Sequence, residues 1–148
     1  MNFTSIPASP EATYAEVAQT FGRVPEFIRN IPPAGVSGAW GGLKVLAFNP
    51  HTAIPPKYKD LITLAVSAQI PCSYCVYFDT QTARLDGATE EEINEAIGMA
   101  AMSRHWSTVL NGMQIDSSRF RKQLTQAFAY IKKQSAPSPH NSQAKTRG

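Results

Sequence analysis

The chain has two cysteines, Cys72 and Cys75, which lie three residues apart between Pro71 and Asp79. If a helix begins at Cys72, the two side chains lie one turn apart on one helical face, a separation that suits a disulfide bond. Unpaired backbone amides in the first turn of a helix also favour a thiolate over a thiol. The spacing therefore permits a dithiol that opens and closes with little backbone movement.

A reactive thiol requires a group that accepts its proton, and three ionisable side chains are candidates. Asp79 follows the second cysteine by four residues and shares its predicted helical face. Asp60 precedes the first cysteine by twelve residues, on a predicted helix that must turn back before the pair and can bring the carboxylate alongside. His105 is the histidine that we expect in packed structure. Each has a simpler interpretation, the two acids as solvent-facing residues and His105 as a hydrogen-bonded packing residue.

Two other interpretations of the cysteine pair stay open. Free cysteine is among the most buried residue types, so both could be inert core residues. Alternatively, Cys72, Cys75, His105 and a carboxylate could bind zinc, although the chain has a single Cys-x-x-Cys and no pair of histidines at zinc-site spacing. In a reducing compartment, closely spaced cysteines are more often a cycling dithiol or a ligand pair than a permanent structural bond.

The elements that position these residues are all predicted to be helices, because apolar residues recur at helical spacing and no segment shows the alternation of a strand. The fold class is therefore all-α, with one helical domain over residues 1–134 and a disordered polar tail over residues 135–148. The run Ser103–Ser107 is expected to interrupt or restart the helical pattern. The predicted helices span about 10–21, 24–31, 40–49, 56–69, 72–85, 89–112 and 117–133.

Composition excludes several classes of protein. Among 148 residues, 43% are hydrophobic and 17% are charged, which is typical of a globular chain. The net charge of +3 comes with many basic residues in the C-terminal segment, where a solvated helix face and a loose tail explain them, so we expect no nucleic-acid partner. Neither a secretory signal nor an apolar run of membrane-spanning length is found, and we expect a soluble cytoplasmic protein without a membrane partner.

The segment Lys57–Cys75, continuing to the Leu85–Ile93 run, resembles the core of the carboxymuconolactone decarboxylase and alkyl hydroperoxidase D superfamily. The resemblance covers roughly residues 21–112. It implies an all-helical subunit that assembles into trimers or hexamers, with a redox-active Cys-x-x-Cys near a subunit contact. It also implies a proton relay through a glutamate and a histidine, at positions that here carry Asp60 and Asp79. An ionised Asp79 would raise the pKa of a nearby thiol, so either a protonated or water-linked Asp79 carboxyl serves in the relay or His105 supplies the imidazole. Of the two, we favour His105.

The resemblance implies a thiol-dependent antioxidant enzyme, in which one cysteine attacks a small peroxide and the other resolves the product. The hypothesis adopted here is that Cys75 attacks and Cys72 condenses with the sulfenate to form a disulfide, while the reverse order stays open. No cofactor is expected beyond an external thiol or dithiol-protein reductant, and the protein is expected to be a homo-oligomer. Two alternatives remain. One is a decarboxylase-like lyase that handles a small carboxylated ring with Arg104 and His105, and the other is a non-catalytic helical oligomer that senses oxidation.

Overall fold

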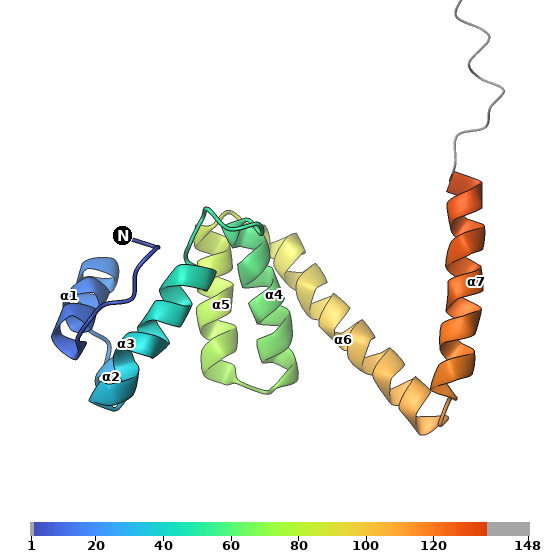
Figure 1. Cartoon of the computed structure of the whole chain (residues 1–148), viewed down its shortest axis with the longest axis horizontal. Coiled ribbons are helices and arrows are strands. Elements are labelled where there is room, and N and C mark those ends of the chain that lie inside the picture. The colour runs from blue at the N-terminus through green and yellow to red at the C-terminus, as the bar shows by residue number, and fades with distance from the viewer. Residues whose placement is uncertain (1, 136–148) are drawn as a thin grey trace, which may run out of the picture. The chain divides into compact units, whose positions relative to one another are not determined.

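The computed structural model describes residues 2–135 of the chain. It divides into two compact units, Met1–Arg104 and His105–Gly148, each described here by itself. The described residues form helices and no strands, so the all-α prediction is confirmed (Figure 1). The predicted tail falls outside the described residues except for Ser135. In chain order the elements are α1 Pro10–Phe21, α2 Glu26–Arg29, α3 Pro33–Gly42, the π-helix η1 Leu43–Ala47, α4 Pro56–Gln69, α5 Ser73–Leu85, α6 Glu90–Gly112 and α7 Ser117–Ser135.

The N-terminal part of the first unit packs α1, α2 and α3 around one small core. Helix α1 begins as predicted, with the Ser9 hydroxyl accepting the backbone N–H of Ala12 at 3.2 Å, and it ends at Gly22, whose φ of 75° is strained for residues with a side chain. The core of this part consists of buried Val17, Ile28, Val36 and Trp40. This core holds the three N-terminal helices together.

Helices α4 and α5 form an antiparallel hairpin and lie side by side (Figure 1). Leu64 of α4 and Ala83 of α5 are buried together with Ile93 at the start of α6. On the opposite face of α4, Ile62 and Val66 are 51% and 54% exposed in the single chain. Helix α4 buries only the face toward its neighbours and leaves an apolar face uncovered.

Helix α6 begins at the predicted capping box and runs without a break to Gly112. The Thr89 hydroxyl accepts the N–H of Glu92 at 3.1 Å, while the Glu92 carboxylate accepts the N–H of Thr89 at 2.9 Å. The expected interruption at residues 103–107 is wrong. That run contains neither proline nor glycine, so its moderate helix propensities do not stop a helix that is already formed.

Glu92 has a further role, since Lys57 of α4 donates to its other carboxylate oxygen at 2.7 Å. Replacing Glu92 with alanine removes half of the capping box and the ion pair together. We expect the free energy of unfolding to fall by about 1–2 kcal/mol, most of it from the lost cap. Urea unfolding measures the change, with Glu91→Ala, an exposed neighbour, as the control. Equal stability of the two variants would contradict the assigned cap.

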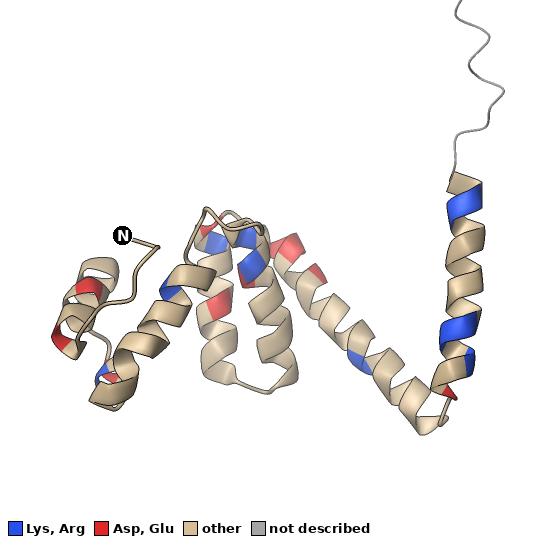
Figure 2. Cartoon of the chain, in the orientation of Figure 1, with Lys and Arg blue, Asp and Glu red and all other residues tan. Residues whose placement is uncertain are grey.

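In the second unit, α7 is amphipathic, with Leu124, Phe128 and Ile131 on one face, and Phe128 is 63% exposed. The predicted helix 117–133 is confirmed and is two residues longer at its end. Figure 2 shows lysine and arginine and no acid along this helix. Among the described helices, none is both long and apolar enough to cross a bilayer.

Candidate redox site

Cys72 and Cys75 are joined by a disulfide at the start of α5, with their Cα atoms 5.3 Å apart. Cys72 is the N-cap residue, with extended backbone angles of φ −97° and ψ 92°, and Cys75 lies in the first turn. The predicted geometry, one helical turn between two bridged sulfurs, is confirmed. The disulfide joins two residues at the start of the same helix. Opening it therefore requires no rearrangement of the surrounding helices.

Backbone amides at this helix start act on the sulfur of Cys72. The N–H of Cys75 donates to the Cys72 Sγ at 3.2 Å, and the N–H of Val76 donates to the Cys72 carbonyl at 2.9 Å. In the opened pair, the same N–H and the positive end of the helix dipole would stabilise a thiolate on Cys72. The local fold thus supplies part of the activation that a redox cysteine needs.

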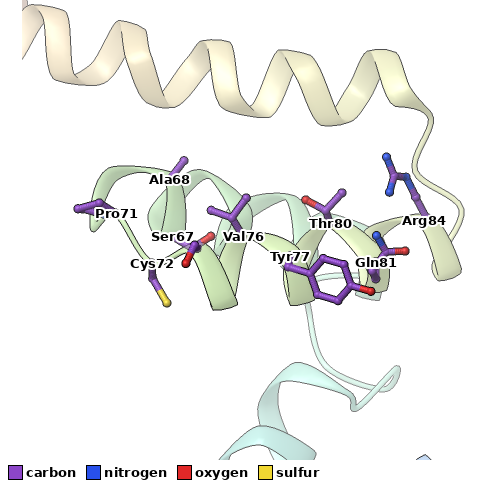
Figure 3. A pocket seen from close by; sticks show the side chains of 10 residues that line it. Ser67, Ala68, Pro71, Cys72, Val76, Tyr77, Thr80, Gln81 and Arg84 are labelled. Carbon is purple, nitrogen blue, oxygen red and sulfur yellow. The ribbon is translucent and has the colours of Figure 1, made fainter.

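A shallow hollow of about 570 Å³ lies beside the disulfide along α4 and α5. Cys72 lies at one end of the row of lining side chains and Arg84 at the other, with Val76 and Tyr77 between them (Figure 3). Cys75 is not among the lining residues. An external thiol that enters this hollow therefore meets the sulfur of Cys72 first.

Asp79 is buried on α5, one turn beyond Cys75, and is thus the predicted acid nearest to the disulfide along the helix. Asp60 is also buried, but the α4–α5 hairpin places it opposite Thr82 and Asp86 near the far end of α5. From Cys75 to Thr82 the helix rises about 10 Å. Asp60 therefore reaches the cysteines only through Asp79 or through water.

The carboxyl of Asp60 has a pKa raised to about 7, first because burial disfavours its charge and next because it shares a hydrogen bond with the carboxyl of Asp86. The charges of Asp86 and Asp79 act in the same direction, and only the hydrogen bond with Thr82 opposes them. Oδ2 of Asp60 is buried and no N–H or hydroxyl reaches it. Among the described residues, that oxygen therefore has no hydrogen-bond partner.

Asp86 was not singled out by the sequence analysis, yet a simple signal indicates it. If the chain reverses at Pro71, residues equidistant from that point face each other across the hairpin, which pairs Asp60 with Thr82 and brings Asp86 one turn away. By the same count, the cysteines lie at the turn of the hairpin, far from Asp60. Counting along an antiparallel pair of helices thus locates the acid pair.

The remaining predicted site residue, His105, lies on α6 in the second unit, where its ring packs edge-on against Trp106 with 5.4 Å between centroids. Its role as the imidazole of the relay stays a prediction. In the first unit, Arg104 donates to the backbone carbonyl of Gln69 at 3.4 Å, and Gln69 lies at the end of α4 just before the cysteine segment. Within residues 2–135, no cluster of three or more His, Cys, Asp or Glu side chains is arranged to hold a metal ion.

Comparison with known proteins gives two results. The model of the carboxymuconolactone decarboxylase family matches residues 37–116, which include η1, the hairpin with its disulfide, and all of α6. The crystal structure of the alkylhydroperoxidase AhpD core from Rhodospirillum rubrum superposes with a TM-score of 0.65 at 26% sequence identity, covering 72% of this chain and 81% of that chain. No curated protein matches the sequence.

Proposed function

Because this chain belongs to the carboxymuconolactone decarboxylase family, in which it is similar to an alkylhydroperoxidase core, we propose that it is a thiol-dependent oxidoreductase that reduces small peroxides. The observation that carries the proposal is the Cys72–Cys75 disulfide at the start of α5. Its position at a helix N-terminus beside an open hollow is suited to a bond that is repeatedly made and broken.

In the oxidative half of the proposed cycle, the thiolate of Cys75 attacks one peroxide oxygen. The O–O bond breaks, the sulfur becomes a sulfenic acid, and the departing alkoxide takes a proton to leave as an alcohol. The Cys72 thiolate then attacks the Cys75 sulfur, forms the disulfide and releases water. The amide of Cys75, 3.2 Å from the Cys72 Sγ, favours the thiolate needed for this second step.

In the reductive half, an external thiol or dithiol protein attacks the disulfide from the hollow. Cys72 lines that hollow, so the mixed disulfide forms on Cys72 and Cys75 leaves as a thiolate. A second thiol of the reductant then attacks the mixed disulfide, which restores both protein thiols and leaves the reductant oxidised. Two electrons enter per cycle and reduce one peroxide, so no further cofactor is required by the proposal.

For proton transfer we assign Asp79 the position next to the cysteines, with Asp60 behind it. Both acids are buried, and the charge of Asp79 raises the pKa of Asp60, so the two carboxyls are linked electrostatically. Asp60 holds its proton near neutral pH because of burial and the Asp86 carboxyl. His105 is the alternative proton acceptor. The His105→Ala variant distinguishes the two routes by its effect on the pH dependence of turnover.

Self-association is part of the proposal. Beside the disulfide, Ile70, Tyr74 and Tyr77 are exposed, and Ile62 and Val66 extend the apolar surface along α4. A single chain leaves this surface in water at considerable cost, and association of several copies would cover it. We therefore propose a homo-oligomer, a trimer or a hexamer, in which part of this surface is buried.

The family name itself favours one second candidate, a decarboxylase-like lyase. That chemistry does not need sulfur, so it would survive replacement of both cysteines, whereas peroxide reduction would not. A third outcome, a disulfide that forms and opens without peroxide consumption beyond the first equivalent, would indicate a redox sensor instead.

The test of the proposal begins with the dithiol. The fully reduced protein, mixed with one equivalent of an alkyl hydroperoxide, is expected to lose both thiols and to form the intrachain disulfide at the first turnover. Alkylation of free thiols followed by mass spectrometry measures the two sulfurs separately. Repeated additions of a dithiol reductant should restore them and consume more peroxide. Thiols that stay free in the presence of excess peroxide would refute the oxidative step.

A further inference from the structure

A second hollow, of about 410 Å³, lies in the first unit at the end of the α4–α5 hairpin away from the disulfide. Its volume falls within the range of small-molecule pockets, and its wall is mostly apolar. The apolar lining comes chiefly from Phe3, Phe21 and Phe48, with Leu85 at the end of α5. Two acids also line it, Asp60 and Asp86, and neither cysteine does.

These acids have no cationic partner within the described part of the first unit. The ion pairs there join Lys44 to Glu16, Lys57 to Glu92 and Arg84 to Glu90. Lys59, the neighbour of Asp60 on α4, is buried and donates instead to the carbonyls of Leu46 and Asn49, at 2.6 and 2.7 Å. When Asp60 is ionised, its charge thus has no cationic partner in this mostly apolar wall.

Asp60 is only 8% exposed, and its Oδ2 accepts no hydrogen bond from the described residues. A buried carboxylate oxygen without a donor is costly, and a ligand that brings a positively charged donor removes that cost. An anionic ligand would meet two carboxyls of its own sign. A neutral apolar ligand would fill the hollow and leave Oδ2 as it is.

We propose that the hollow between the N-terminal helices and the end of the α4–α5 hairpin binds a small organic cation, a primary ammonium with an aromatic or aliphatic body. The ammonium donates to the carboxylates of Asp60 and Asp86, and the body packs among Phe3, Phe21 and Phe48. Aromatic faces also attract a cation within about 6 Å, which adds to the selectivity for charge. The inference does not depend on the proposed peroxide chemistry.

One consequence separates this site from a merely apolar hollow. The groups that act on Asp60 are Asp86 and Asp79, which raise its pKa, and Thr82, which lowers it, while Lys59 is held by backbone carbonyls. A bound cation favours the ionised form of Asp60, whose proton then leaves. Binding near neutral pH therefore releases protons, and tighter binding is expected at higher pH.

The experiment titrates benzylamine into the full chain with its disulfide intact, by isothermal calorimetry at about pH 7 in two buffers of different ionisation enthalpy. A Kd on the order of 1 mM is expected for a ligand of this size, and the difference in heat between the buffers should reveal proton release. Benzyl alcohol, which has the same shape without the charge, is expected to bind at least about tenfold more weakly.

Variants locate the site. Asp60→Asn and Asp86→Asn are each expected to weaken benzylamine about tenfold, since each removes one carboxylate. Asp60→Asn should also abolish proton release, because Asp60 is the group with the raised pKa. Glu95→Gln, an exposed acid on α6, is the matched control and should bind as the parent chain does. Phe3→Ala, outside the helices, tests the aromatic wall without removing a helical contact.

Three outcomes would overturn the inference. Benzyl alcohol binding as tightly as benzylamine would show an apolar hollow without charge selectivity. Benzylamine binding that Asp60→Asn and Asp86→Asn leave unchanged would place the cation elsewhere. No heat from benzylamine up to tens of millimolar, with the variants still folded by circular dichroism, would show that the hollow takes no such ligand.

Discussion

Replacing Cys75 with serine is expected to reduce reductant-coupled peroxide turnover by at least about 100-fold, because a hydroxyl does not ionise near neutral pH and attacks peroxide poorly. Replacing Cys72 is expected to have a comparable effect for a different reason. In that variant Cys75 still forms a sulfenic acid, but no neighbouring thiolate condenses with it, and the cycle stops after one turnover. The coupled assay measures the loss in both variants.

Chemical trapping of the sulfenic acid distinguishes the roles of Cys72 and Cys75. A diketone reagent that reacts with sulfenic acids should label Cys72→Ser after one equivalent of peroxide and should not label Cys75→Ser. Labelling of the second variant alone would reverse the assignment of the two sulfurs. Ser73→Ala, between the cysteines on the exposed side of the helix start, is the matched control and should keep its turnover.

Full turnover in either serine variant would refute the proposed mechanism. The double variant then becomes informative about the family's other chemistry, since lyase activity on a small carboxylated ring should persist without sulfur. Loss of folding does not confuse this result, because the disulfide closes a loop of only a few residues and contributes little to the stability of the fold.

Replacing Asp60 with asparagine is expected to change the pH dependence of stability. In the folded chain the pKa of Asp60 is about 7, raised first by burial, against 3.8 for an unperturbed aspartate. Between these two values the folded state binds more protons than the unfolded state, so the free energy of unfolding falls as the pH rises from about 4 to about 7 and levels off above that. Asparagine carries no such proton, so the variant loses this component of the slope.

Across that range, the free energy of unfolding of the parent chain is expected to fall by roughly 2 kcal/mol relative to the variant. This is less than the full pKa shift of Asp60 implies, because Asp60 is coupled to Asp86, which is exposed to solvent. At about pH 8 the variant should be more stable than the parent chain, since its neutral amide donates to Asp86 where an ionised Asp60 would repel it. Urea unfolding of both proteins over this range measures the difference between them, which cancels the contribution of other titrating groups.

Carboxylates with a lowered pKa have the opposite effect on the pH dependence of stability, and they act at lower pH. Hydrogen bonds and ion pairs hold the pKa of Glu90, Glu92 and Asp116 below the ordinary value, so their contribution to stability is lost as the pH falls below about 4. Glu95→Gln should keep the slope of the parent chain between about pH 4 and 7. A constant stability difference between Asp60→Asn and the parent across that range would show that Asp60 is ionised throughout.

The amino-acid sequence predicted most of the helices, although not the start of α3 at Pro33, and it predicted the one-turn spacing of the two sulfurs. Ser9 with Pro10, the Thr89 and Glu92 capping box, and the cysteine spacing act through backbone groups a few residues away, so local interactions suffice to predict them. The expected break in α6 at residues 103–107 failed for a local reason too, because no residue there is a strong helix breaker.

What only the tertiary structure decided is which of the facing side chains are buried, and by what. The reversal of the chain between α4 and α5 places Asp60 against Thr82 and Asp86 instead of beside the cysteines, and it encloses these acids with aromatic residues from the N-terminal segment. Burial, and with it the raised pKa of Asp60, depends on the packing of segments some forty residues apart along the chain. Because desolvation is a property of that packing and not of any one residue, no local pattern in the sequence specifies it.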